Sequence, residues 1–83
     1  MIMTLELSMY PLREDYKTPI QHFIDKLNAD WSDLRITTTA TSTMVCGEYD
    51  RLMQMMSVML RWSYDTHGKA VYVAKFIPDY DPA

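Results

Sequence analysis

The order in which hydrophobic periodicity changes along the chain constrains the fold more than any other feature. In residues 2–10, apolar and polar residues alternate. The apolar set is Met3, Leu5, Leu7 and Met9. A period of two is typical of a strand with one buried face. We expect Pro11 to end this strand, because proline has no N–H to donate to a neighbouring strand.

Two later stretches have the period of a helix. In residues 18–29 the apolar residues are Ile20, Phe23, Ile24 and Leu27. Their spacing of i, i+3, i+4 and i+7 predicts a helix, with Thr18 as its cap and Gln21 completing a capping box. Residues 50–66 form the second predicted helix. Its apolar face is Leu52, Met53, Met56, Met59 and Leu60, with Asp50 as the N-cap and Gly68 past the C-terminal end.

The remaining segments favour extended chain. Residues 34–39 and 41–46 are rich in β-branched side chains and predict two strands joined by a short hairpin near Ala40. Residues 71–77 predict a last strand that Pro78 stops. We expect the tail after it, residues 79–83, to fray.

The resulting order, βαββαβ, predicts a single α+β domain over residues 1–83. It is the order of the ferredoxin-like fold, a four-stranded antiparallel sheet with two helices on one face. The helices should cover the face that carries Leu5, Leu7 and Leu34. Alternation assigns to the open face Glu6, Ser8, Tyr10, Arg35, Thr37, Thr39 and Thr43. A half-apolar open face in so small a domain favours a homodimer or homotetramer joined through the sheets.

Composition excludes several kinds of partner and site. The net charge of −3 and the pI of about 5.1 leave no basic face for nucleic acid. No stretch approaches the ~18 apolar residues of a membrane span, and the N-terminus lacks a basic signal-peptide region, so we expect a cytoplasmic protein. One cysteine, Cys46, makes no intrachain disulfide, and with two dispersed histidines it predicts no metal site.

Candidate chemistry is sparse. No nucleophile, base and orienting group stand at a recognisable spacing, so the sequence predicts neither an enzyme nor a cofactor. The methionines of residues 50–66 could bind a soft metal or an adaptable partner, but their spacing favours core packing. The Thr/Ser cluster of residues 37–43 has two interpretations: strand propensity in an exposed hairpin, or hydroxyls lining a pocket for a small polar ring with Tyr10 stacked on it. Composition alone favours the first.

Two short motifs favour the second interpretation. Ser8-Met9-Tyr10-Pro11 and Ser42-Thr43-Met44-Val45-Cys46-Gly47 resemble the S-x-Y-P and S-T-x-x-x-G segments of the YkoF-related family, in the same order and places. The segment ending at Phe76 is also similar, so the resemblance covers nearly the whole chain. It implies a ferredoxin-like domain that binds thiamine or its hydroxymethylpyrimidine precursor without catalysis. Where the family's namesake has two such repeats in tandem, this chain has one, so a second chain would supply the other half.

Carried over by motif position, the resemblance implies ligand-binding roles for Ser8, Tyr10, Ser42 and Thr43, and strand alternation adds Thr39. The first hypothesis is therefore a small-molecule binding protein for a thiamine-like heterocycle. The alternative is an interaction module that only oligomerises, in which the threonines serve strand propensity. An enzyme on the same fold is a third, weaker hypothesis, since fold does not decide function.

Overall fold

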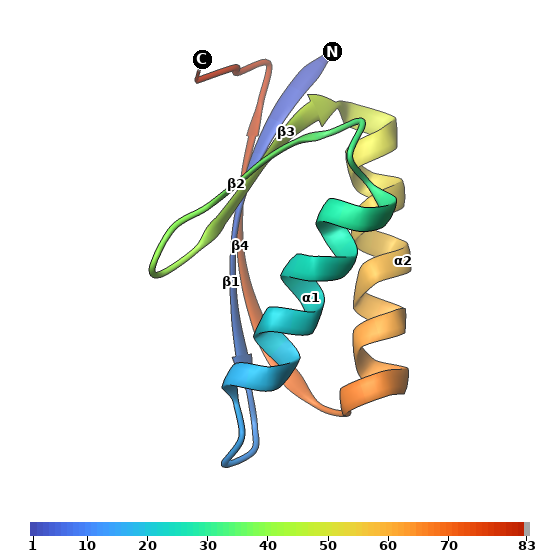
Figure 1. The fold of residues 1–83 in the computed structure, drawn as a ribbon. Coiled ribbons are helices and arrows are strands. Elements are labelled where there is room, and N and C mark those ends of the chain that lie inside the picture. Colours follow the sequence, from blue (N-terminus) through green and yellow to red (C-terminus); the bar gives the residue numbers. More distant parts are fainter. Residues whose placement is uncertain (83) are drawn as a thin grey trace.

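The computed structural model describes residues 1–82 and contains one sheet and two helices. The elements are β1 (Ile2–Pro11), α1 (Lys17–Asp30), β2 (Arg35–Thr38), β3 (Thr43–Glu48), α2 (Tyr49–His67) and β4 (Ala70–Pro78). The sheet is antiparallel with strand order β2-β3-β1-β4, and both helices lie on one of its faces (Figure 1). The predicted ferredoxin-like α+β fold is confirmed. Within residues 1–82, neither helix is long and apolar enough to cross a membrane.

The central strand β1 determines which side chains face the helices. Leu5 lies directly opposite Val45 of β3 and Phe76 of β4, so these side chains share a face. Leu5 and Val45 are fully buried, which identifies that face as the one under the helices. Thr43 pairs with Leu7 and therefore lies on the same face, 7% exposed. The prediction that Thr43 lies on the open face is wrong, because pairing with β1, rather than alternation counted through the hairpin, sets its orientation.

Both helices begin one residue earlier than predicted, and their caps differ. At α1, Asp15 does the capping: its Oδ1 accepts hydrogen bonds from the Thr18 N–H at 3.3 Å and the Thr18 hydroxyl at 3.0 Å. At α2, the side chain of Glu48 accepts from the Arg51 N–H at 3.1 Å. The predictions that Thr18 and Asp50 cap these helices are therefore wrong. In each helix, a carboxylate earlier in the chain accepts the hydrogen bond from a free N–H group. The C-terminal prediction is confirmed, since Gly68 has φ +83°.

The methionines of α2 are mainly core residues. Met55, Met56 and Met59 are buried, whereas Met53 is 39% exposed. The buried set continues the stripe of Leu52 at i+3, i+4 and i+7, and Met53 lies about 100° away around the helix axis. The assignment of Met53 to the apolar face is therefore wrong, and that of Met56 and Met59 is confirmed. Core packing accounts for three of the four methionines in this helix.

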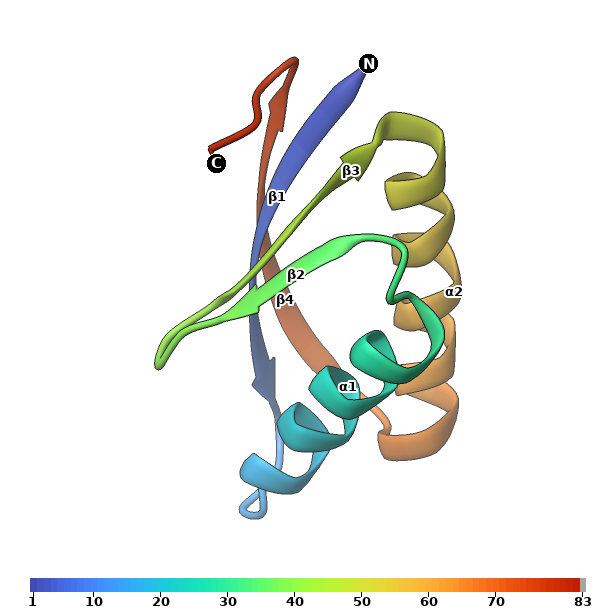
Figure 2. The same ribbon diagram turned by 45° about the horizontal axis from the view of Figure 1, so that its top comes forward.

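The C-terminal tail does not fray within the described residues. It crosses the sheet face opposite the helices (Figures 1 and 2). The Thr4 hydroxyl of β1 donates to the carbonyl oxygen of Tyr80 at 2.7 Å, and Arg35 of β2 pairs with Asp81. The tail therefore spans from the central strand to the far edge of the sheet. It leaves Thr4 only 1% exposed on a face that alternation assigned to open surface, and residue 83 lies outside the described chain.

The position of the C-terminal tail explains the burial of Cys46 and leads to a prediction. Cys46 pairs with both Thr4 and Arg35, the two residues that hold the tail, and is 7% exposed. Removing residues 79–83 is expected to raise the rate of Cys46 labelling by a thiol reagent severalfold, because the covering segment is lost. The substitution Glu14→Ala, in an exposed loop, is the control. Equal labelling rates in the truncated and full-length chains would show that the tail does not protect the thiol.

Candidate functional site

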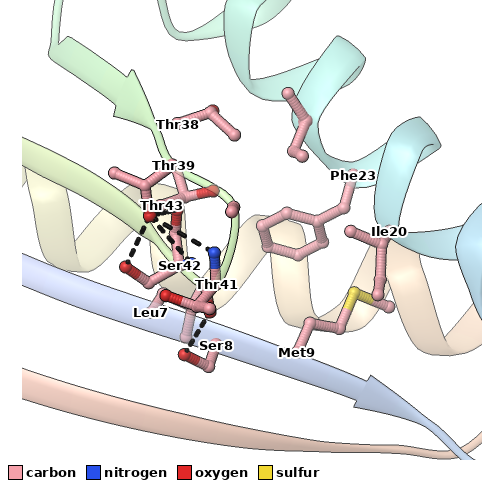
Figure 3. A pocket seen from close by; sticks show the side chains of 12 residues that line it. Leu7, Ser8, Met9, Ile20, Phe23, Thr38, Thr39, Thr41, Ser42 and Thr43 are labelled. Carbon is pink, nitrogen blue, oxygen red and sulfur yellow. Dashed lines mark hydrogen bonds between the residues drawn. The ribbon is translucent and has the colours of Figure 1, made fainter.

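A small cavity lies where the β2–β3 hairpin passes over the end of β1 and the side of α1. Its volume is about 100 Å³, and Figure 3 shows the side chains around it. The lining residues are Leu7, Ser8, Met9, Ile20, Phe23, Ile24, Thr38, Thr39, Ala40, Thr41, Ser42 and Thr43. Hydroxyls from the hairpin and Ser8 form one side, and apolar side chains of β1 and α1 form the other. The structure thus brings four of the five predicted site residues, Ser8, Thr39, Ser42 and Thr43, to one cavity.

Thr39 holds the hairpin turn. Its Oγ1 accepts from the N–H groups of Thr41 at 3.4 Å and Ser42 at 3.2 Å, and donates to the Ser42 carbonyl oxygen at 3.1 Å. The Ser42 hydroxyl oxygen lies 3.3 Å from Thr39 Oγ1. Thr39 also lies in the turn, outside β2, so its predicted position on a strand is wrong. Its hydroxyl is engaged within the turn, which makes it a residue that shapes the cavity wall.

Ser8 fixes the hairpin to the central strand. The pairing of β1 with β3 ends at Leu7, and the Ser8 hydroxyl then donates to the Thr41 carbonyl oxygen at 3.1 Å. This bond closes the cavity at the point where the ladder between the two strands has ended. Thr43 differs from both Ser8 and Thr39. It lines the cavity and is 7% exposed, and its hydroxyl has no hydrogen-bond partner among residues 1–82.

Tyr10 lies beside the cavity, in a second hollow of about 370 Å³. That hollow is lined by Met9, Tyr10, Pro11, Tyr16, Ile20, Ala40 and Thr41. Four of these residues, Met9, Ile20, Ala40 and Thr41, also line the smaller cavity, so the two hollows adjoin. Tyr16 was not among the predicted site residues, because it precedes α1 in a loop. Its only signal is an exposed aromatic residue six positions after Tyr10.

Size and charge limit what the two hollows can accept. Ligand pockets usually measure about 300–1,000 Å³, so the cavity admits one small ring and the remainder of a ligand must lie in the adjoining hollow. None of the residues that line either hollow carries a carboxylate, imidazole, amine, guanidinium or thiol. Glu6, the nearest carboxylate on β1, pairs instead with Lys75 at 3.4 Å. Hydroxyls, carbonyls and aromatic faces are therefore the groups available for recognition.

A second polar cluster joins the two helices on the other side of α1. His22 Nδ1 lies 3.1 Å from His67 Nε2, and the ring centroids are 4.9 Å apart. Trp62 contacts the His67 ring edge-on at a centroid distance of 6.0 Å. The sequence separation of 45 positions concealed this pair, which the fold brings together because α1 and α2 pack side by side.

The histidine pair gives a pH prediction. Burial, followed by the charges of His22 and Arg13, lowers the pKa of His67 below its ordinary value of 6.5, and Asp15 opposes them. The folded state therefore binds fewer protons than the unfolded chain, so stability is lost as pH falls from 6.5 to the lowered pKa. We expect the melting temperature to fall as the pH is lowered through 6.5, and to fall less in His67→Asn. Identical pH profiles in a calorimetric comparison would contradict this.

Comparison with known proteins establishes the fold. No protein-family model and no curated protein matches the chain. A Streptococcus pneumoniae crystal structure superposes with a TM-score of 0.86 at 20% identity, over 96% of this chain and 89% of that one. A Thermotoga maritima structure, described as that of a proposed thiamine biosynthesis or salvage protein, gives 0.82 at 19% identity, over 98% and 85%. A Bacillus cereus domain of unknown function gives 0.73 at 20%, over 99% and 78%.

Proposed function

We propose that this protein is a cytoplasmic small-molecule binding protein for a thiamine-like heterocycle and that it performs no catalysis. The observation that carries the proposal is the hydroxyl-lined cavity and its aromatic neighbour, formed by the two motifs that resemble the YkoF-related family. The Thermotoga maritima neighbour, with its proposed role in thiamine biosynthesis or salvage, supports the same ligand class. Binding without turnover fits lining residues that include no carboxylate, imidazole, amine or thiol.

The two hollows suit the two parts of such a ligand. A neutral aminopyrimidine has ring nitrogens and an amino group, and the hydroxyls of Thr43 and Ser42 offer both donors and acceptors to them. Phe23 and Leu7 provide apolar contact on the opposite wall. A second ring or a short substituent would then lie against Tyr10 in the larger hollow. Since no basic group lines either hollow, the site disfavours a phosphorylated ligand.

Thermal unfolding in the presence of candidate ligands tests the function directly. A ligand that binds only the folded state at 100 times its Kd adds about 2.7 kcal/mol of stability. Hydroxymethylpyrimidine and thiamine are expected to raise the melting temperature, and thiamine diphosphate to raise it less. Ribose, a polar ring with no aromatic face to stack on Tyr10, serves as the control. If no pyrimidine shifts the transition, the interaction module becomes the better account of this chain.

Assembly gives a separate prediction. The tail covers the sheet face near Thr4, but the other end of that face is exposed, with Tyr10 at 55%, Val71 at 48% and Val73 at 58%. Val71 and Val73, two positions apart on β4, form an apolar patch on this face that a second copy could bury. We therefore expect a homodimer or homotetramer by light scattering at micromolar concentration. A mass near 9.8 kDa would contradict it, and Val73→Lys should shift an oligomer toward that mass.

A further inference from the structure

We propose that His22 and His67 form a binding site for a divalent transition-metal ion that prefers imidazole ligands, such as Ni²⁺, Cu²⁺ or Zn²⁺. The ion would be held by His22 Nδ1 and His67 Nε2 and would bridge α1 to α2. The site lies on a different side of α1 from the hydroxyl-lined cavity, and the inference does not depend on the proposed ligand.

The spacing of the two nitrogens suits such an ion. Metal–nitrogen bonds of about 2.0–2.1 Å place two ligands about 2.9 Å apart at an octahedral angle and about 3.3 Å apart at a tetrahedral one. The observed separation of 3.1 Å lies between these values. Two ring nitrogens on different helices are therefore already at the distance that a shared ion requires.

The backbones of α1 and α2 hold the two histidines in position. His22 lies within α1 (Lys17–Asp30), and His67 is the last residue of α2. Beyond it, the Gly68 N–H donates to the Tyr64 carbonyl oxygen at 2.8 Å, and the Trp62 ring supports the imidazole of His67. Because the site is largely pre-formed, little conformational entropy is lost when the ion binds.

The two imidazoles can bind an ion without any net loss of protons. When both imidazoles are neutral, one ring N–H donates to the other ring across the 3.1 Å contact. For both nitrogens to bind a cation, the donating ring must move that proton to its remote nitrogen, which leaves each ring neutral and releases no net proton. The nearby charges of Arg13 and Asp15 have opposite signs and act on His67 in opposite directions.

The ligand count sets the strength and selectivity of the site. Within residues 1–82, no third His, Cys, Asp or Glu joins the pair, so water completes the coordination sphere. A site of two imidazoles and water binds more weakly than a closed four-ligand zinc site. Its affinity for divalent metals should follow the general order, in which Cu²⁺ and Ni²⁺ bind more tightly than Mn²⁺ and Fe²⁺. Ca²⁺ and Mg²⁺ prefer oxygen ligands, so a site of two imidazole nitrogens should not bind them.

Titration with NiCl₂ tests the proposal, because Ni²⁺ avoids redox reaction with the Cys46 thiol. We expect Ni²⁺ to raise the melting temperature of the full chain, EDTA to reverse the shift and MgCl₂ to leave it unchanged. His22→Asn and His67→Asn should each weaken Ni²⁺ binding in calorimetry at least about tenfold, since each removes one of two ligands. Asp25→Asn, on the same helix as His22, is the matched control and should bind Ni²⁺ as the wild type does.

A second measurement keeps the proposal testable if a variant unfolds. In the wild type, paramagnetic Ni²⁺ should broaden the imidazole resonances of His22 and His67 before any others. The proposal is overturned if Ni²⁺ produces no shift in melting temperature, if both histidine variants bind it with unchanged affinity, or if resonances of the Met1 amino terminus broaden first.

Discussion

Phe23→Ala is expected to lower the free energy of unfolding by about 3–5 kcal/mol, the usual cost of deleting a buried phenylalanine. Phe23 is 3% exposed and lies between α1 and the sheet, with its ring centroid 6.0 Å from that of Tyr72. The truncation removes apolar contact and leaves a void that the rigid strand and helix backbones cannot close. Since small domains have only about 0.05–0.15 kcal/mol of stability per residue, this is a large part of the total.

Urea denaturation followed by circular dichroism measures the effect, with Glu14→Ala as the control. Glu14 lies in the exposed loop before α1, so its truncation should change stability by less than about 0.5 kcal/mol. Because Phe23 also borders the hydroxyl-lined cavity, its loss should enlarge that cavity and favour the upper half of the range. Equal midpoints for the two variants would mean that α1 does not pack through Phe23.

Tyr10→Ala is expected to weaken binding of a thiamine-like heterocycle by about tenfold to a hundredfold. Stacking of a heterocyclic base on an aromatic side chain contributes about 1–3 kcal/mol, and Tyr10 is the exposed aromatic wall of the larger hollow. Thr43→Val should weaken binding less, by up to about tenfold, because it removes one hydrogen bond to a neutral ring. Isothermal calorimetry with hydroxymethylpyrimidine or thiamine measures both.

Matched variants separate binding from folding. Tyr10→Phe keeps the ring and should retain most of the affinity. Thr37→Val makes the same chemical change as Thr43→Val, on the sheet face away from the helices, and should leave the affinity unchanged. Wild-type affinity in both Tyr10→Ala and Thr43→Val would falsify the site. If Thr37→Val weakened binding as much as Thr43→Val, the ligand would lie on the opposite face of the sheet.

The candidate site shows where prediction from the sequence ended. Motif position identified Ser8, Ser42, Thr43 and Tyr10, and the structure places all four at the two hollows. What motif position did not give is the role of each hydroxyl. The Ser8 hydroxyl bonds to the Thr41 carbonyl oxygen of the hairpin, whereas the Thr43 hydroxyl has no partner within residues 1–82. This difference depends on contacts across the sheet, which the motifs do not encode. Tyr16 went unnoticed because a loop residue has no periodicity from which its direction can be inferred.

The sequence by itself determined the order of strands and helices, because that order depends on periodicities of 2 and 3.6 residues that are local to each segment. It also determined that Phe23 and Leu27 of α1 are buried, whereas Ile20 and Ile24 of the same predicted stripe are only half-buried. Tertiary structure alone decided the face of Thr43, since a strand's orientation follows from its register with β1 across a 35-residue gap. It alone decided that the tail covers Thr4 and that His22 meets His67. Such contacts join residues far apart in the chain, and their free energy depends on the whole fold rather than on any local pattern.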